Sequence, residues 1–190
     1  MELWDLFDEN RRPLNRRQSR LAPKVHGEYH LVAVICVVNS KHEILLTLRH
    51  PEKEKYPNLW ENTGGCIQAG ETSRAGAVRE LFEETGIRAE EEELQFLETQ
   101  KEEYSIIDFY FLRRDVAISE IVLQDMETVD AKWVTLEELH RMGKDGLIAG
   151  PIYRRIQSLG KRFETWVLGE QKEQADKISL AAGGGACCEA

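Results

Sequence analysis

Hydrophobic residues gather into short blocks separated by polar turns, and this pattern predicts several β-strands on either side of one long helix. Residues 29–38 are almost continuously apolar and β-branched, which is typical of a strand buried on both faces. The turn sequence Asn39-Ser40-Lys41 follows, so we expect a hairpin with the next apolar block. The strands predicted from such blocks span residues 3–7, 29–38, 44–48, 60–65, 94–98, 105–112 and 133–134.

A central helix is predicted over residues 73–85. Thr72 or Ser73 is a suitable N-cap, because a hydroxyl oxygen accepts a hydrogen bond from a free N–H group of the first turn. Gly86 is a suitable stop, because glycine readily takes the left-handed conformation at a helix C-terminus. The helix therefore has recognisable signals at both ends.

Two further helices are expected towards the C-terminus. Thr135 is predicted to cap a short helix that runs to Met142. Pro151 favours a helix start, and apolar residues recur behind it at helical spacing, which predicts one amphipathic closing helix over residues 151–169. Residues 171–190 turn polar and end in a glycine- and cysteine-containing segment, so we expect that tail to be disordered.

This order of elements predicts an α/β fold, an α/β/α sandwich around a mixed β-sheet. We expect a single domain over residues 1–170, with an N-terminal strand and basic arm over 1–27 and a core over 28–142. Residues 9–24 are polar and contain two prolines, so a turn or exposed arm is predicted there rather than a strand. This segment carries Arg11, Arg12, Arg16, Arg17 and Arg20.

Composition narrows the possible partners. The chain has 190 residues and a formal net charge of −9, which argues against a nucleic-acid duplex as the main partner. A small anionic substrate stays possible, because a bound cation can invert the local field. The sequence has no apolar run of about 18 residues and no signal-peptide pattern, so no membrane partner is expected. The four cysteines lack metal-finger spacing, and a cytoplasmic location is expected.

The candidate chemistry lies on the central helix. Glu80, Glu83 and Glu84 fall three and four residues apart, so they share one helix face. Three like charges repel one another unless a cation lies among them. Carboxylate oxygens suit a hard dication such as Mg²⁺ or Mn²⁺, which keeps coordination positions open for water and phosphate. The helix therefore predicts metal-dependent phosphate chemistry.

The segment also matches a longer pattern, G-x(5)-E-x(7)-R-E-U-x-E-E-x-G-U, where U is a bulky apolar residue. It resembles the Nudix box, and the resemblance extends over about residues 28–142 as the Nudix fold. The resemblance implies a MutT-like Nudix hydrolase. The matching positions are Gly65, Glu71, Arg79, Glu80, Leu81, Glu83, Glu84, Gly86 and Ile87.

The resemblance implies specific roles in metal binding. Glu80 and Glu84 would be the main ligands of Mg²⁺ or Mn²⁺, helped by Glu83 and the carbonyl of Gly65. The substrate would be a small molecule that contains a diphosphate linkage, and water would attack one phosphorus atom. The chemistry of Arg79 agrees with this, because its guanidinium can hold a carboxylate with two hydrogen bonds.

A carboxylate must also accept the proton of the attacking water. Glu83 is one candidate for this catalytic base. Related enzymes often place another glutamate on a loop before a Trp-containing strand, and Glu127 precedes Trp133 by six residues. Arg79 completes the predicted catalytic set, with the expected role of fixing Glu71 or Glu83 in place.

Outside the box, the chain resembles the isopentenyl-diphosphate-isomerase-like branch of the family. The resemblance implies that Arg49 and Lys53 face the diphosphate, although a basic loop paired with Glu52 or Glu54 is the alternative. Gly64 occupies the position of the isomerase catalytic cysteine, and Cys66 occupies that of one metal-binding histidine. Since glycine cannot move a proton, the sequence favours hydrolysis over isomerisation.

Several alternatives stay open. Isopentenyl-diphosphate isomerase and a non-catalytic ligand-binding module are the alternatives to a hydrolase. Nucleoside diphosphates and related nucleotides are the substrates that the family resemblance suggests, and the organic moiety is not specified by any loop. His30 is either a ligand or a hydrogen-bonded residue at the rim of the sheet. The arginines of residues 11–20 either clamp a phosphate or form a solvated arm. The chain is expected to be a monomer or a homodimer.

Overall fold

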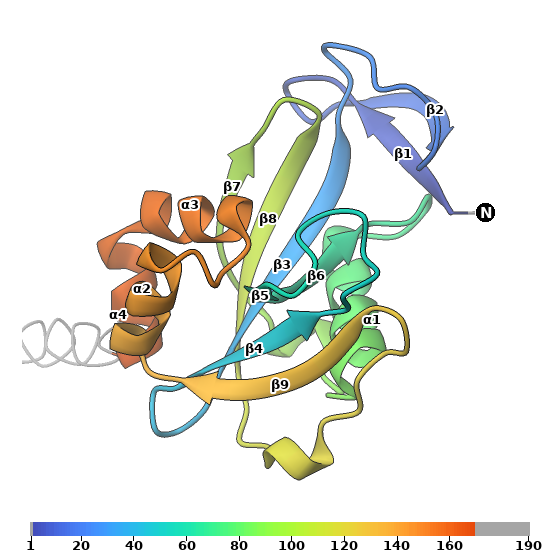
Figure 1. Ribbon diagram of the computed structural model, residues 1–190. Helices are drawn as coiled ribbons and strands as arrows, with labels where there is room; N and C mark the ends of the chain where they lie inside the picture. Colours follow the sequence, from blue (N-terminus) through green and yellow to red (C-terminus); the bar gives the residue numbers. More distant parts are fainter. Residues whose placement is uncertain (1, 170–190) are drawn as a thin grey trace, which may run out of the picture.

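A computed structural model describes residues 2–169 (Figure 1). The predicted tail over residues 171–190 lies outside the described residues. The chain contains both strands and helices, with short 3-10 turns at Glu91–Glu93 and Ile118–Glu120. The elements are β1 (Leu3–Phe7), β2 (Pro13–Ser19), β3 (His30–Val38), β4 (Ile44–Arg49), β5 (Trp60–Glu61), β6 (Thr63–Cys66), α1 (Ser73–Thr85), β7 (Gln95–Lys101), β8 (Ser105–Arg113), β9 (Thr128–Val134), α2 (Leu136–Lys144), α3 (Gly150–Leu159) and α4 (Lys161–Leu168).

The main sheet is mixed, as predicted. Its strands follow the order β5-β4-β3-β8-β7, while β6 pairs with β3 and β9 pairs with β4. The β3–β8 pair is parallel, in register from His30 opposite Ser105 to Val38 opposite Arg113. The other pairs of this sheet are antiparallel. Strand β3 therefore connects both halves of the sheet.

Helices cover both faces of the sheet, which confirms the α/β/α sandwich. Figure 1 shows α1 on one face and α2, α3 and α4 on the other. Side chains alternate along β3, so Ala33 and Ile35 pack in the core beneath α1 with Leu81. Cys36 lies in the opposite core, together with Phe163 of α4. The near-continuous apolar sequence of β3 follows from burial on both faces.

The basic arm expected over residues 9–24 is partly a strand. Strand β2 pairs with β1 in a two-stranded antiparallel hairpin. The connecting turn is held by Asp8, whose Oδ1 accepts the N–H groups of Asn10 (2.9 Å) and Arg12 (2.8 Å). Most β2 side chains are exposed, and such a strand has no apolar alternation that would reveal it in the sequence.

Two other elements differ from the predicted ones. Strand β9 spans Thr128–Val134, whereas the sequence predicts a strand only over residues 133–134. The single closing helix predicted over 151–169 is interrupted at Gly160, whose φ of 51° breaks it into α3 and α4. Apolar spacing continues through the break, because both helices pack on the same core. None of the helices within residues 2–169 has the length and apolarity that a membrane crossing requires.

Candidate functional site

The loop from β6 into α1 positions the candidate site. The Thr72 hydroxyl accepts the N–H of Ala75 at 3.0 Å, and this caps the helix as the sequence predicts. At the other end, Gly86 has φ of 72° and donates its N–H to the carbonyl of Phe82 at 2.8 Å. The caps set the two ends of α1, and its apolar residues Ala77 and Leu81 pack in the core, with the glutamate face beside β6.

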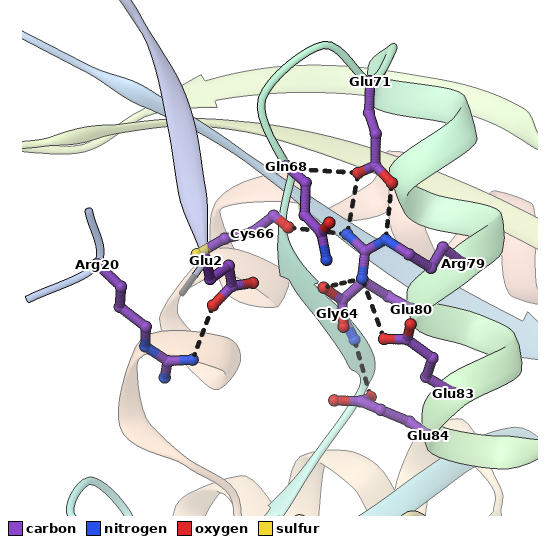
Figure 2. A network of polar contacts seen from close by, with 10 residues as sticks. All are labelled: Glu2, Arg20, Gly64, Cys66, Gln68, Glu71, Arg79, Glu80, Glu83 and Glu84. Atoms are coloured by element: carbon purple, nitrogen blue, oxygen red, sulfur yellow. Dashed lines mark hydrogen bonds and ion pairs between the residues drawn. The ribbon is translucent and has the colours of Figure 1, made fainter. Parts of the chain in front are cut away.

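Glu80 and Glu84 approach the β6 backbone closely (Figure 2). The N–H of Gly64 donates to Glu84 Oε2 at 3.2 Å. A Cβ atom at Gly65 would lie 2.3 to 2.5 Å from the carboxylate atoms of Glu80, well inside contact distance. Only glycine therefore fits at position 65 with Glu80 in this orientation, and the carboxylates lie beside the backbone of both glycines.

Arg79 connects the carboxylates of the box (Figure 2). Its guanidinium binds Glu71 with two hydrogen bonds of 2.8 and 3.0 Å. It also donates to Glu80 at 2.9 Å, to Glu83 at 3.1 Å and to the carbonyl of Cys66 at 3.1 Å. The sequence predicts that Arg79 holds Glu71 or Glu83, and the structure shows that it holds both. Its hydrogen bonds lower the pKa of Glu71 below its ordinary value.

Glu84 has no cationic partner among the described contacts. Its side chain accepts one backbone N–H, and burial raises its pKa well above the ordinary value, with a further contribution from the charges of Glu61 and Glu80. Burial also raises the pKa of Glu80 and of Glu61. A cation bound here would relieve this repulsion, so the charge distribution and the all-oxygen donor set fit Mg²⁺ or Mn²⁺.

The described side chains do not form a ready-made metal cage. Within residues 2–169, no three histidine, cysteine, aspartate or glutamate side chains lie together at distances suited to one ion. Arg79 occupies one oxygen of Glu80 and one of Glu83. Metal binding would therefore require small side-chain movements on α1, with Arg79 giving up part of its contacts.

These groups border a cleft of about 260 Å³. The cleft brings together most of the predicted site residues, whereas Glu71 and Gly86 are not among its lining residues. Its charged lining residues are Arg20, Arg49, Lys53 and Arg79 on the basic side and Glu2, Glu80, Glu83, Glu84 and Glu127 on the acidic side. A larger hollow of about 430 Å³ lies on the outer side of α1 and lacks such a convergence of charges.

Arg49 and Lys53 do not pair with Glu52 or Glu54. Arg49 binds Glu61 at 2.5 Å, and Lys53 forms an ion pair with Glu127. Both basic side chains are mostly buried, with 18% and 17% exposed. Each lies in or beside the carboxylate cleft, so cations and acids are already paired before any ligand binds.

Sequence reasoning missed Glu2 and Glu61 as site residues. It named Arg20 only as one of the arginines of residues 11–20, which were expected either to clamp a phosphate or to form a solvated arm. Glu61 stands directly after Trp60 on a strand that ends at the box glycines, and this position is a signal that could have been used. Glu2 and Arg20 reach the cleft through the β1–β2 hairpin, and no motif marks them.

His30 and Cys66, which the sequence analysis also considers, have packing roles in the structure. His30 is buried and stacks on Trp4 with ring centroids 4.2 Å apart, and burial lowers its pKa to about 4. It is therefore a neutral packing residue at the sheet rim. Burial raises the pKa of the Cys66 thiol to about 11, which agrees with a packing role for this residue.

Comparisons with known proteins identify the family. Residues 28–156 match the model of the NUDIX domain. An uncharacterised Nudix hydrolase of Listeria monocytogenes is 37% identical over 150 residues, which cover 77% of this chain and 87% of that protein.

Solved structures share the fold. A protein of Deinococcus radiodurans has a TM-score of 0.70 at 22% identity, over 83% of this chain and 98% of that one. A bifunctional NMN adenylyltransferase/ADP ribose pyrophosphatase of Francisella tularensis, complexed with AMP and a manganese ion, has a TM-score of 0.57 at 23% identity, over 75% and 43% of the two chains. With the complete box in place, the chain belongs to the Nudix hydrolase family and is a diphosphohydrolase.

Proposed function

We propose that this enzyme uses Mg²⁺ or Mn²⁺ to hydrolyse a diphosphate linkage in a nucleoside-diphosphate-type substrate. One observation carries the proposal: the buried carboxylate of Glu84 lies beside Glu80 and the β6 glycines, and no cationic side chain of residues 2–169 pairs with it. Such an arrangement is costly in the absence of a bound cation. The Francisella protein, with AMP and manganese, supports the assignment of both substrate class and metal.

Glu80 and Glu84 would hold the metal, together with Glu83 and the carbonyl of Gly65. The dication supplies charge neutralisation for the phosphates and makes water more acidic. The residues of the chain orient these groups. Arg79 acts as a positioning residue, because its contacts with Glu71 and with the Cys66 carbonyl fix the glutamate face of α1 against β6.

Two carboxylates can accept the proton of water. Glu83 contacts only Arg79 among the described hydrogen bonds, its side chain is 39% exposed, and it lines the cleft. Glu127 is paired with Lys53, and its carbonyl accepts the N–H of His50 at 2.8 Å. When Arg49 and Lys53 bind the substrate phosphates, Glu127 loses its partner and becomes available as a base.

We also propose that residues 1–170 act as one catalytic unit. Two contacts support this. Glu2 and Arg20 of the N-terminal hairpin line the same cleft as the box. His42 lies on the β3–β4 turn, and its Nδ1 is 3.0 Å from the carbonyl of Val167 in α4.

The test is product release over a panel of nucleoside diphosphates, dinucleotides and nucleotide sugars, with Mg²⁺, Mn²⁺ or EDTA. We expect turnover only with metal, and a loss of about 100-fold or more in Glu84→Gln and in Glu83→Gln. Arg162→Ala is the matched control, since that side chain lies away from the cleft and is 59% exposed.

Two outcomes would favour the alternatives. Conversion of isopentenyl diphosphate to its dimethylallyl isomer would establish an isomerase despite Gly64. Tight binding of a nucleotide with no hydrolysis in wild type would indicate a binding module. If wild type is no faster than Glu84→Gln on every substrate, the proposal is wrong.

A further inference from the structure

The β1–β2 hairpin forms one side of the cleft, and it brings a fourth cation there. Glu2 and Arg20 stand at the open end of the hairpin, where the N–H of Arg20 donates to the carbonyl of Glu2 at 3.4 Å. Figure 2 shows their side chains approaching from the side opposite α1. Both line the cleft beside Gly64, Gly65 and Glu80. The cleft therefore has one wall from the box and another from residues outside it.

The position of this wall is fixed by contacts with the loop before α1. The N–H of Ala69 donates to the carbonyl of Leu3 at 2.8 Å, and the N–H of Gly70 donates to Asp5 Oδ2 at 2.7 Å. Trp4 is buried, and it stacks on His30 of β3. The hairpin is thus attached to the box loop itself, so the backbone at Arg20 has a defined place relative to the carboxylates.

The far end of the hairpin is anchored as well. Arg11, in the turn between the strands, donates through Nη1 to Oδ1 of Asp108 at 2.6 Å. Asp108 is 1% exposed, and it also accepts hydrogen bonds from Ser73 (2.5 Å) and Thr99 (2.6 Å). Anchors at both ends make the hairpin a rigid part of the site rather than a solvated arm.

Arg20 is the least committed cation of the cleft. Arg79, Arg49 and Lys53 have side chains that are only 20%, 18% and 17% exposed, and each is held by a carboxylate at close range. Arg20 is 60% exposed, and its contact with Glu2 is 3.5 Å long, at the limit of a hydrogen bond. A phosphate that enters the cleft can therefore bind the Arg20 guanidinium, and only the long contact with Glu2 is lost.

We propose that Arg20 is a substrate-binding residue that holds a phosphate group of the diphosphate, and that Glu2 keeps it in place until the substrate displaces the Glu2 carboxylate. The assignment rests on the proposed function of the cleft. The chemistry fits, because a guanidinium can bind two phosphate oxygens at once. A diphosphate also carries at least two negative charges, against one on the carboxylate that it replaces. The hairpin then contributes to substrate selection in addition to closing the cleft.

The hairpin offers a matched control. Arg17 is also 60% exposed and also pairs with an acid of the hairpin, Asp5, at 3.1 Å, but it does not line the cleft. Arg20→Ala and Arg17→Ala therefore remove the same charge from the same element. Any difference between the two variants reports on the cleft and not on net charge or hairpin stability.

The experiment is calorimetric titration of methylenediphosphonate, a diphosphate analogue that resists hydrolysis, into the protein with Mg²⁺ present. We expect Arg20→Ala to weaken binding by about tenfold and Arg17→Ala to change it by less than about twofold. Glu2→Gln should strengthen binding by about threefold, because it frees Arg20 and removes a negative charge. A purely structural role of the pair would not produce this gain.

Hydrolysis by the same variants separates the two proposals. If wild type hydrolyses a diphosphate, Arg20→Ala should raise KM by about tenfold and change kcat less. Equal binding by the Arg20 and Arg17 variants, or no binding of the analogue by wild type, overturns the role of Arg20. If wild type hydrolyses no diphosphate, the proposed function is wrong, whatever the binding titrations show for Arg20.

Discussion

The box helix and the β1–β2 hairpin meet at the same cleft, yet their charged residues are organised in different ways. On α1, Arg79 is 20% exposed and contacts three carboxylates and one carbonyl. On the hairpin, Arg17 and Arg20 are each 60% exposed and each contact one acid. Buried networks lose much when one member is removed, whereas exposed pairs lose little. The box is therefore built for fixed geometry, and the hairpin side chains remain available to a ligand.

The largest effect is expected from Arg79→Ala. The change leaves Glu71, Glu80 and Glu83 without their shared cation, so we expect the free energy of unfolding to fall by about 3 kcal/mol at neutral pH. Urea denaturation measures it. Mg²⁺ should restore part of the loss, because the dication can take the place of the guanidinium among the carboxylates. Arg162→Ala, on an exposed pair, should cost less than about 1 kcal/mol, and equal costs for the two would contradict the comparison.

Gly65→Ala should separate activity from stability. The new Cβ would collide with the Glu80 carboxylate, which can swing away at little cost to the fold but then leaves the β6 backbone. Turnover should fall by about 100-fold, while the thermal midpoint changes by only a few degrees. The control is Gly150→Ala, whose Cβ would meet only the flexible end of Arg154, at 3.3 Å. Full activity of the Gly65 variant would show that Glu80 does not need its present orientation.

Asp108→Asn tests the anchor of the hairpin. Burial alone would raise the pKa of Asp108, but hydrogen bonds from Arg11, Ser73 and Thr99 outweigh it and hold the pKa below the usual 3.8. The ionised form is therefore favoured in the folded state, so its stabilisation is present above the usual pKa and is lost as pH falls through the lowered one. We expect a cost of about 2 kcal/mol at pH 7.

The pH dependence supplies the control for this prediction. The stability difference between wild type and Asp108→Asn, measured by urea denaturation, should begin to shrink as pH falls below the usual 3.8. It should vanish only below the lowered pKa, where the wild-type carboxyl group is protonated in the folded state too. A difference that stays constant down to pH 2 would mean that the ionised carboxylate is not what stabilises the hairpin.

The smallest effect is expected from Arg17→Ala. Arg17 and Asp5 have side chains that are 60% and 34% exposed, so water and salt screen their attraction. The free energy of unfolding should change by less than about 0.5 kcal/mol, and added salt should remove the difference. A larger loss of stability would show that the exposed Arg17–Asp5 pair stabilises the fold as the Arg79 network does, which would contradict the contrast between the hairpin and α1.

The sequence predicts the parts of the molecule that have strong local signals. The caps Thr72 and Gly86, the buried strand β3 and the role of Arg79 as a holder of carboxylates all follow from residue type and spacing. The sandwich follows from the order of elements. These features depend on residue types and spacings that are close together in the sequence, so they can be recognised from the sequence alone.

Other features depend on contacts between distant residues. Strand β2 is polar and exposed, so no periodicity distinguishes it from a loop. The break at Gly160 is hidden because apolar residues continue on both sides of it. Glu2 and Arg20 are ordinary charged residues until the fold brings them to the box, and no motif marks them. Glu61 is signalled only by its place after Trp60, on a strand that ends at the box glycines.

The parallel pairing of β3 with β8 has a consequence for how the chain is made. Its partners are 75 residues apart, as His30 opposite Ser105 shows. During synthesis, β3 cannot pair with β8 until β8 has left the ribosome. Until then, the edge of β3 that faces β8 in the folded protein has no hydrogen-bonding partner. A nascent or truncated chain that stops before residue 105 therefore presents that edge to other molecules, and it is the species that chaperones would have to protect from aggregation.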